Sequence, residues 1–151
     1  MAADNKSYDN DFYTWTQTQG AIIREKRFEE IDTDNVAEEI ESWGQHFRHK
    51  LSDLVDLLQT CLLLCGVNKA TAYTMHTREV LRLHVQDMLE DYPGLKGELP
   101  SILAEGWTDS VKYATYQTGL TSADFPEGCP WGIPELLLEY WYPERMSRGA
   151  M

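Results

Sequence analysis

Apolar side chains recur every three or four residues through one long stretch of the chain, from Asp32 to Val67. This spacing matches a helix of 3.6 residues per turn and places the side chains on one stripe along it. At ~1.5 Å per residue the helix would be roughly 45–50 Å long, and its stripe needs a partner surface of similar length. We therefore expect the whole stripe to be buried, with Trp43 in the core. The stripe consists of Val36, Ile40, Trp43, Phe47, Leu51, Leu54, Leu58, Cys61 and Cys65.

The same period predicts a first helix before this stretch, between residues 8 and 23, with Asp9 or Asp11 as its N-terminal cap. Only a short connection separates it from the long helix, so the two should form an antiparallel hairpin. A third helix is expected over residues 70–92, where Pro93 ends it.

A fourth helix follows Pro93, with Gly119 as its C-terminal cap. Beyond it, residues 121–131 are too rich in proline, glycine and acidic residues for regular structure. A short helix over residues 135–139 is marginal alone, so we expect the segment from Trp131 to Pro143 to pack as a clasp on the other helices. No segment has the alternation of a strand.

The predicted fold is therefore all-α, a bundle of four main helices with a short C-terminal helical clasp. We expect a flexible N-terminus over residues 1–7, a single domain over 8–143 and a C-terminal tail over 144–151. The 151 residues, 42% of them hydrophobic, suit one domain with a sizeable core.

Charge narrows the range of partners. The formal net charge is −12, which disfavours nucleic acid and anionic membranes and favours a basic protein or a cation. The N-terminus has no apolar run typical of a signal peptide, and the longest apolar run, Leu57–Val67, is too short to span a bilayer. Three cysteines cannot all pair internally, which favours a reducing compartment. We expect a cytoplasmic protein.

Several short motifs follow one another in order along the chain. They are Tyr8-x-x-Asp11-Phe12-x-x-Trp15, then Arg24, Phe28 and Asp32, then Glu38-Glu39-Ile40-Glu41-x-x-Gly44, and finally Thr118-Gly119-Leu120, Phe125-Pro126, Cys129-Pro130 and Trp141-x-Pro143. Together they resemble the bacterial DUF29 family. The resemblance covers roughly residues 8–143 and implies an all-helical domain of unknown function, with no catalytic residue to transfer.

Candidate metal ligands are few. His46 and His49 have the i, i+3 spacing of helical ligand pairs, and an antiparallel third helix would place His84 at the height of His49. Glu41 could add a carboxylate. The alternative is that these are surface or edge side chains, since such spacing often occurs without a metal. We predict no cofactor and can name no catalytic residue.

Two other groups have structural and functional interpretations. The carboxylates at Glu38, Glu39 and Glu41 could bind a cation with Asp11 or Asp32, or could simply complement the positive end of the helix dipole. Cys61 and Cys65 suit buried apolar positions better than a disulfide, because their side-chain directions within one helix are unfavourable.

The long helix becomes apolar on nearly all sides around Leu57, Leu63 and Leu64. Such a segment is either central in its own bundle or shared with a second chain, which makes these leucines interface candidates and a homo-oligomer possible. Two functions therefore stay open. One is a non-catalytic protein–protein interaction module that self-associates or binds a basic protein; the alternative is a metal-dependent enzyme with a His/carboxylate site.

Overall fold

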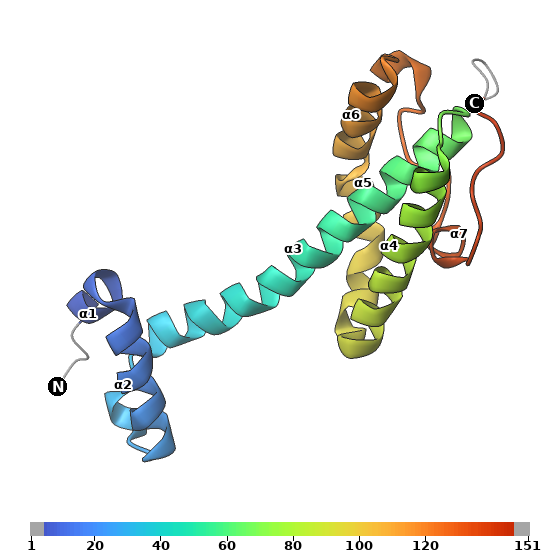
Figure 1. Ribbon diagram of the computed structural model, residues 1–151. Coiled ribbons are helices and arrows are strands. Elements are labelled where there is room, and N and C mark those ends of the chain that lie inside the picture. Colours follow the sequence, from blue (N-terminus) through green and yellow to red (C-terminus); the bar gives the residue numbers. More distant parts are fainter. Residues whose placement is uncertain (1–4, 147–151) are drawn as a thin grey trace. The chain divides into compact units, whose positions relative to one another are not determined.

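The computed structural model describes residues 5–146, and all regular structure within that range is helical (Figure 1). The predicted all-α class is confirmed. The chain divides into two compact units, unit 1 up to Phe47 and unit 2 from Arg48 onward. The elements are α1 (Asn5–Asn10), α2 (Phe12–Arg24), η1 (Phe28–Glu30), α3 (Thr33–Gly66), α4 (Ala72–Asp91), η2 (Pro93–Glu98), α5 (Leu99–Glu105), α6 (Trp107–Thr118), η3 (Ser122–Asp124) and α7 (Ile133–Leu137).

Unit 1 contains α1, α2 and the first part of α3, and α2 lies steeply across the start of α3 rather than alongside it (Figure 1), so the predicted antiparallel hairpin is not confirmed. The Trp15 indole N–H donates to Asp32 Oδ2 at 3.0 Å, and Gln19 Oε1 accepts from the Asp32 backbone N–H at 2.9 Å. These bonds hold α2 against the connection that leads into α3. Asp11 caps α2 by accepting from the Thr14 N–H at 3.1 Å, so the first predicted helix is divided there into α1 and α2.

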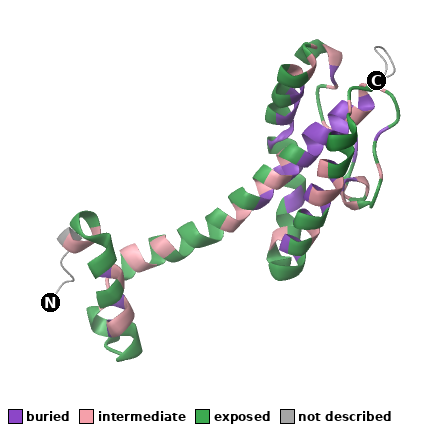
Figure 2. Cartoon of the chain, in the orientation of Figure 1, coloured by how far each residue is buried: buried purple, intermediate pink, exposed green. Residues whose placement is uncertain are grey.

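Unit 2 is built around the second half of α3, where the buried residues concentrate (Figure 2). On one side Cys65 of α3 contacts Arg78 of α4, and on the other the Ser110 hydroxyl of α6 donates to the Asp56 carbonyl at 3.0 Å. Fully buried side chains such as Leu51 and Leu58 lie between these helices. Here the predicted stripe does have its partner surface.

The fourth predicted helix is divided at Gly106 into α5 and α6. A Cβ atom on residue 106 would overlap the carboxylate of Asp56, so any larger residue at this junction would force the Asp56 side chain to move. At the other end Gly119 adopts a left-handed φ of 72° and ends α6, as predicted.

The predicted clasp is confirmed. Trp131 and Leu136 are buried in the core of unit 2, with 6% and 0% of their surface exposed. Arg82 of α4 donates to the carbonyls of Leu136 and Trp141 at 2.8 and 2.9 Å, which secures the clasp to α4.

One prediction about the long helix is wrong. Ile40 and Trp43 are 68% and 63% exposed, so the first half of the stripe is not core. The helical period correctly places these side chains on one face, but within unit 1 α2 packs against the start of α3 and leaves that face uncovered.

The predicted arrangement of four helices in one bundle is not confirmed, because α2 belongs to unit 1 and α4 to α6 belong to unit 2. That residues 8–143 form a single domain stays a prediction.

The predicted flexible ends lie partly outside the described residues, at 1–4 and 147–151. Within the described range, residues 5–7 already belong to α1. At the other end the Met146 N–H donates to the Gly66 carbonyl at 2.7 Å, in the tail predicted over 144–151. Among residues 5–146, no helix combines the length and apolar character needed to cross a membrane.

Candidate functional site

The structure does not bring the candidate metal ligands together. His46, His49, His84 and Glu41 are all exposed. Across residues 5–146, no three His, Cys, Asp or Glu side chains are grouped so that they could hold a metal ion. The three cysteines are free thiols. Burial raises the pKa of Cys61 to about 11, which leaves it protonated and suits the apolar role inferred from the sequence.

Two of the acidic residues around the start of α3, Asp32 and Glu39, have hydrogen-bond partners within the chain. Asp32 Oδ2 accepts from the Asn35 side chain at 2.8 Å as well as from Trp15, and Glu39 Oε1 accepts from the Tyr8 hydroxyl at 2.6 Å. These bonds hold α1 and α2 to α3 and to the residue that precedes it. Asp32 and Oε1 of Glu39 therefore have a structural use within unit 1.

The interface candidates at the apolar end of α3 require a correction. Leu63 is 0% and Leu64 is 4% exposed, because α3 is central in unit 2 and its neighbours cover both side chains. Neither leucine presents a surface to a second chain. Leu57 differs, with 48% of its surface exposed.

The exposed aromatic surface lies instead in unit 1, where α2 and α3 form the two walls of a groove of about 550 Å³. Phe12 and Thr16 come from α2, and Trp15 is buried to 4% exposure. The wall from α3 consists of Glu39, Ser42, Trp43 and His46. We call this the aromatic groove.

Ring contacts support both walls of the aromatic groove. Phe12 stacks on Trp15 with centroids 5.6 Å apart, and Tyr8 meets Trp15 edge to face at 4.8 Å. On α3 the Trp43 ring contacts the rings of His46 and Phe47 at 5.8 and 6.2 Å. Phe12 and Trp43 nevertheless stay 46% and 63% exposed. Such exposed aromatic surface is typical of a binding site.

Negative charge gathers at one end of the aromatic groove, around Tyr8. The pKa of Tyr8 is raised to about 12, first by its hydrogen bond to Glu39, then by burial and by the charges of Glu38, Glu39 and Asp9. Between Thr33 and Phe47, α3 carries four carboxylates and no lysine or arginine. A cationic ligand is therefore favoured at this end.

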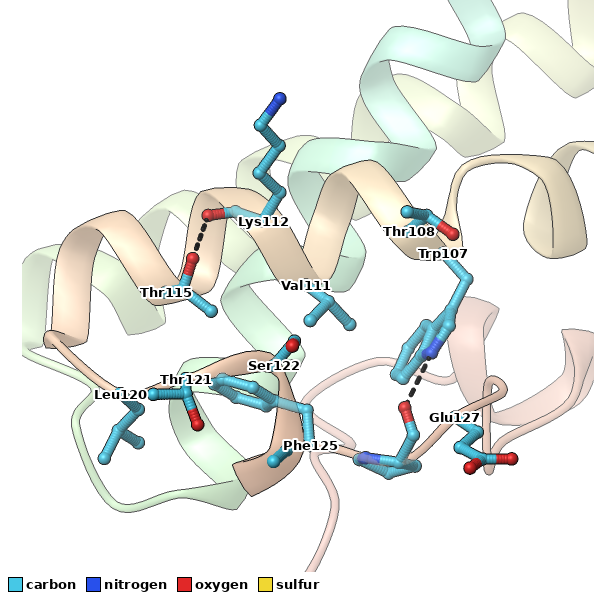
Figure 3. Close-up of a pocket in the computed structure, with 12 residues that line it drawn as sticks. Trp107, Thr108, Val111, Lys112, Thr115, Leu120, Thr121, Ser122, Phe125 and Glu127 are labelled. Atoms are coloured by element: carbon cyan, nitrogen blue, oxygen red, sulfur yellow. Dashed lines mark hydrogen bonds between the residues drawn. The ribbon is translucent and has the colours of Figure 1, made fainter.

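Unit 2 contains a larger hollow of about 820 Å³, between α6 and the segment that follows it (Figure 3). The Trp107 indole N–H donates to the Pro126 carbonyl at 3.0 Å, and the Thr115 hydroxyl donates to the Lys112 carbonyl. Its apolar lining is already covered, since Trp107 and Phe125 are only 4% and 5% exposed. A ligand would gain little apolar contact here.

Buried polar groups in unit 2 were missed by the sequence reasoning. Asp56 Oδ1 lies against Gly106 with no hydrogen-bond partner within the described residues. Burial raises the pKa of Asp56 from 3.8 to about 7, and the charges of Asp109 and Asp53 add to the shift. No local sequence signal marks this site, because the contact joins residues fifty positions apart.

The second missed group joins α4 to the clasp. Arg78 and Arg82, 5% and 1% exposed, both donate to Glu79 Oε1, at 3.0 and 2.6 Å. Glu79 Oε2 accepts from the Tyr140 N–H at 3.2 Å. Arg78 also lies over the Tyr142 ring, 5.0 Å from its centroid. One sequence signal could have revealed this group: Arg78 and Arg82 lie one turn apart on the face of α4 that also carries Leu81, Val85 and Leu89.

The family comparison is decisive for the classification. The family described as "Domain of unknown function DUF29" matches residues 7–142. The chain belongs to the DUF29 family. The match includes the aromatic groove and residues 131–142 of the clasp, so both lie in the DUF29 domain of this chain. Comparisons with curated proteins and with solved structures found no match.

Proposed function

We propose that this DUF29 protein is a non-catalytic module that binds another protein through the aromatic groove of unit 1. The observation that carries the proposal is the exposure of Ile40 and Trp43, at 68% and 63%, beside a groove with further aromatic residues. Aromatic side chains dominate the energetics of protein interfaces, and a contiguous exposed group of them is seldom left without a partner.

The charge of unit 1 favours a basic partner over a second copy. The first 47 residues contain eleven Asp and Glu against four Lys and Arg. A second copy would bring the same excess of negative charge to the interface, at a cost in electrostatic repulsion. A partner rich in lysine and arginine would instead be attracted to Glu39 and its neighbours. Free thiols at all three cysteines are in keeping with a reducing compartment such as the cytoplasm.

The first prediction concerns Trp43. Because this side chain is mostly exposed, Trp43→Ala should lower the free energy of unfolding by less than ~1 kcal/mol, as is usual for surface substitutions. The same variant should lose binding of the partner. A photo-crosslinking residue placed at position 43, in cells that make the protein, would identify the partner, whose affinity is then measured with purified components by calorimetry.

Tyr73 supplies the matched control, because it is 78% exposed but lies on α4 in unit 2. Tyr73→Ala should bind the partner like the wild type, while Trp43→Ala should bind at least ~10-fold more weakly, as for a central interface tryptophan. Equal binding by both variants would overturn the proposal. So would a wild-type dimer, seen by light scattering, that Trp43→Ala dissociates, because the occupant would then be a second copy.

A further inference from the structure

The shape of the aromatic groove indicates the secondary structure of the partner segment that it binds. Its walls are two helices, and α3 lines it with Glu39, Ser42, Trp43 and His46, at i, i+3, i+4 and i+7. From Glu39 to His46 this wall is roughly 10 Å long, the length of about two helical turns. A groove with this periodicity accepts a helix that has apolar anchors at the same spacing.

Charge is distributed unevenly along the aromatic groove. Glu39 is in its lining, and its Oε1 accepts from the Tyr8 hydroxyl. Within residues 5–146, Oε2 of Glu39 has no hydrogen bond or ion pair and is therefore available to a cation. Glu38 and Asp9 act on the same Tyr8 hydroxyl, so their negative charge lies at this end. Further along α3 the wall consists of Trp43 and His46, and neither of these side chains is negatively charged.

Resting on the proposed function, we infer that the partner segment is a basic amphipathic helix whose contacting face covers about two turns. Its apolar side chains fill the groove over Trp15 and against Phe12 and Trp43. A lysine or arginine at one end pairs with Glu39, and this pair sets the direction in which the helix lies. The wide aromatic part supplies affinity, and the carboxylates select the basic helix over an acidic one.

Two synthetic peptides of about 15 residues test this inference. Both carry leucine and phenylalanine at i, i+3 or i+4, and i+7, and they differ only in having lysine or glutamate at the remaining positions. Binding to the full chain is followed by calorimetry and by the tryptophan emission maximum. The lysine peptide should bind and shift the emission to shorter wavelength, and the glutamate peptide should not.

A matched pair of variants separates the groove from general attraction to an acidic protein. Glu39→Gln should weaken binding of the lysine peptide about two- to fivefold, the usual range for a partly exposed ion pair, and reduce its dependence on salt. Glu41→Gln removes the same charge from an exposed position outside the lining and should bind like the wild type. Equal effects of the two variants would overturn the inference, because binding would then depend on net charge alone.

Failure of this inference can be distinguished from failure of the proposed function. If neither peptide binds, but the crosslinked partner binds and loses affinity with Trp43→Ala, the groove binds a protein in another form and only the basic helix is refuted. If Trp43→Ala leaves partner binding unchanged, the proposed function itself fails.

Discussion

Arg82 is a charged side chain at the centre of a packed unit. Burial lowers the pKa of its guanidinium, an effect that the charge of Glu79 opposes. The guanidinium nevertheless remains charged, because the ordinary pKa of arginine lies far above neutral pH. Two of its three hydrogen bonds join α4 to the carbonyl groups of Leu136 and Trp141 in the clasp, and the third reaches Glu79 on α4 itself. Removing the Arg82 side chain would leave the carbonyl groups of Leu136 and Trp141 without their donor, which would destabilise the folded state.

We therefore predict that Arg82→Ala lowers the free energy of unfolding by ~3–5 kcal/mol, the usual cost of breaking a buried ion pair. Arg82→Lys keeps the charge but lacks the planar fork that reaches three acceptors, so it should also be clearly destabilised. Urea denaturation measures both. Arg145→Ala, at an exposed position, is the control and should melt like the wild type. A wild-type value for Arg82→Lys would mean that charge alone matters at this position.

Asp56 makes the free energy of unfolding depend on pH between about 4 and 7. Its pKa is raised to about 7 in the folded protein, so the folded state favours the protonated form. Stability from this group is present at low pH and is lost as pH rises from about 4 through about 7. Because the side chain is partly exposed, the free energy of unfolding should change by only a fraction of the ~1.4 kcal/mol per pH unit expected when one proton is fully released.

The corresponding experiment is urea denaturation at pH 6 and pH 8.5. We expect Asp56→Asn to be more stable than the wild type at pH 8.5, with a smaller difference at pH 6. Asp53→Asn, at an exposed position one turn earlier on α3, should not remove the pH dependence. If the wild type and Asp56→Asn have parallel pH profiles, the carboxylate is not the titrating group.

At the scale of elements, α3 shows what a helical period can and cannot predict. Its bounds, Thr33–Gly66, agree with the predicted range because the apolar spacing continues through all of it. The same spacing continues from Leu103 through Trp107 to Val111, and therefore hides the break at Gly106. A period reports which side chains share a face. Whether another helix covers that face depends on contacts distant in sequence, which is why Trp43 was wrongly placed in the core.

The clasp is the element whose removal should be most harmful. Without residues 133 onward, the fully buried Leu136 is lost and Arg82 loses two of its acceptors. We predict that this truncated chain melts at least several degrees below the full chain or becomes insoluble, as measured by circular dichroism and by the soluble yield. A truncated chain with an unchanged melting temperature would show that α7 contributes nothing to unit 2.

At the scale of the whole molecule, the all-α class, the long helix and the packed clasp were predictable, because each depends on local spacing and on proline or glycine signals. The candidate site was not. Its residues come from two helices, and their importance lies in being uncovered, which a sequence pattern does not report. Arg82 and Asp56 were missed for the opposite reason, since charged residues normally indicate a surface and these two are held by backbone carbonyls or pressed against a glycine.

The link between Arg82 and the clasp also sets an order of events during synthesis. Trp141 follows Arg82 by 59 positions, so a ribosome that adds ~5–20 residues per second delivers this partner roughly 3–12 seconds after the arginine. Until then Glu79 can pair with the guanidinium, but its two bonds to the clasp cannot form. Unit 2 therefore completes its packing late, whereas the hydrogen bonds that hold unit 1 together span at most 31 positions and can form while the rest is still being made.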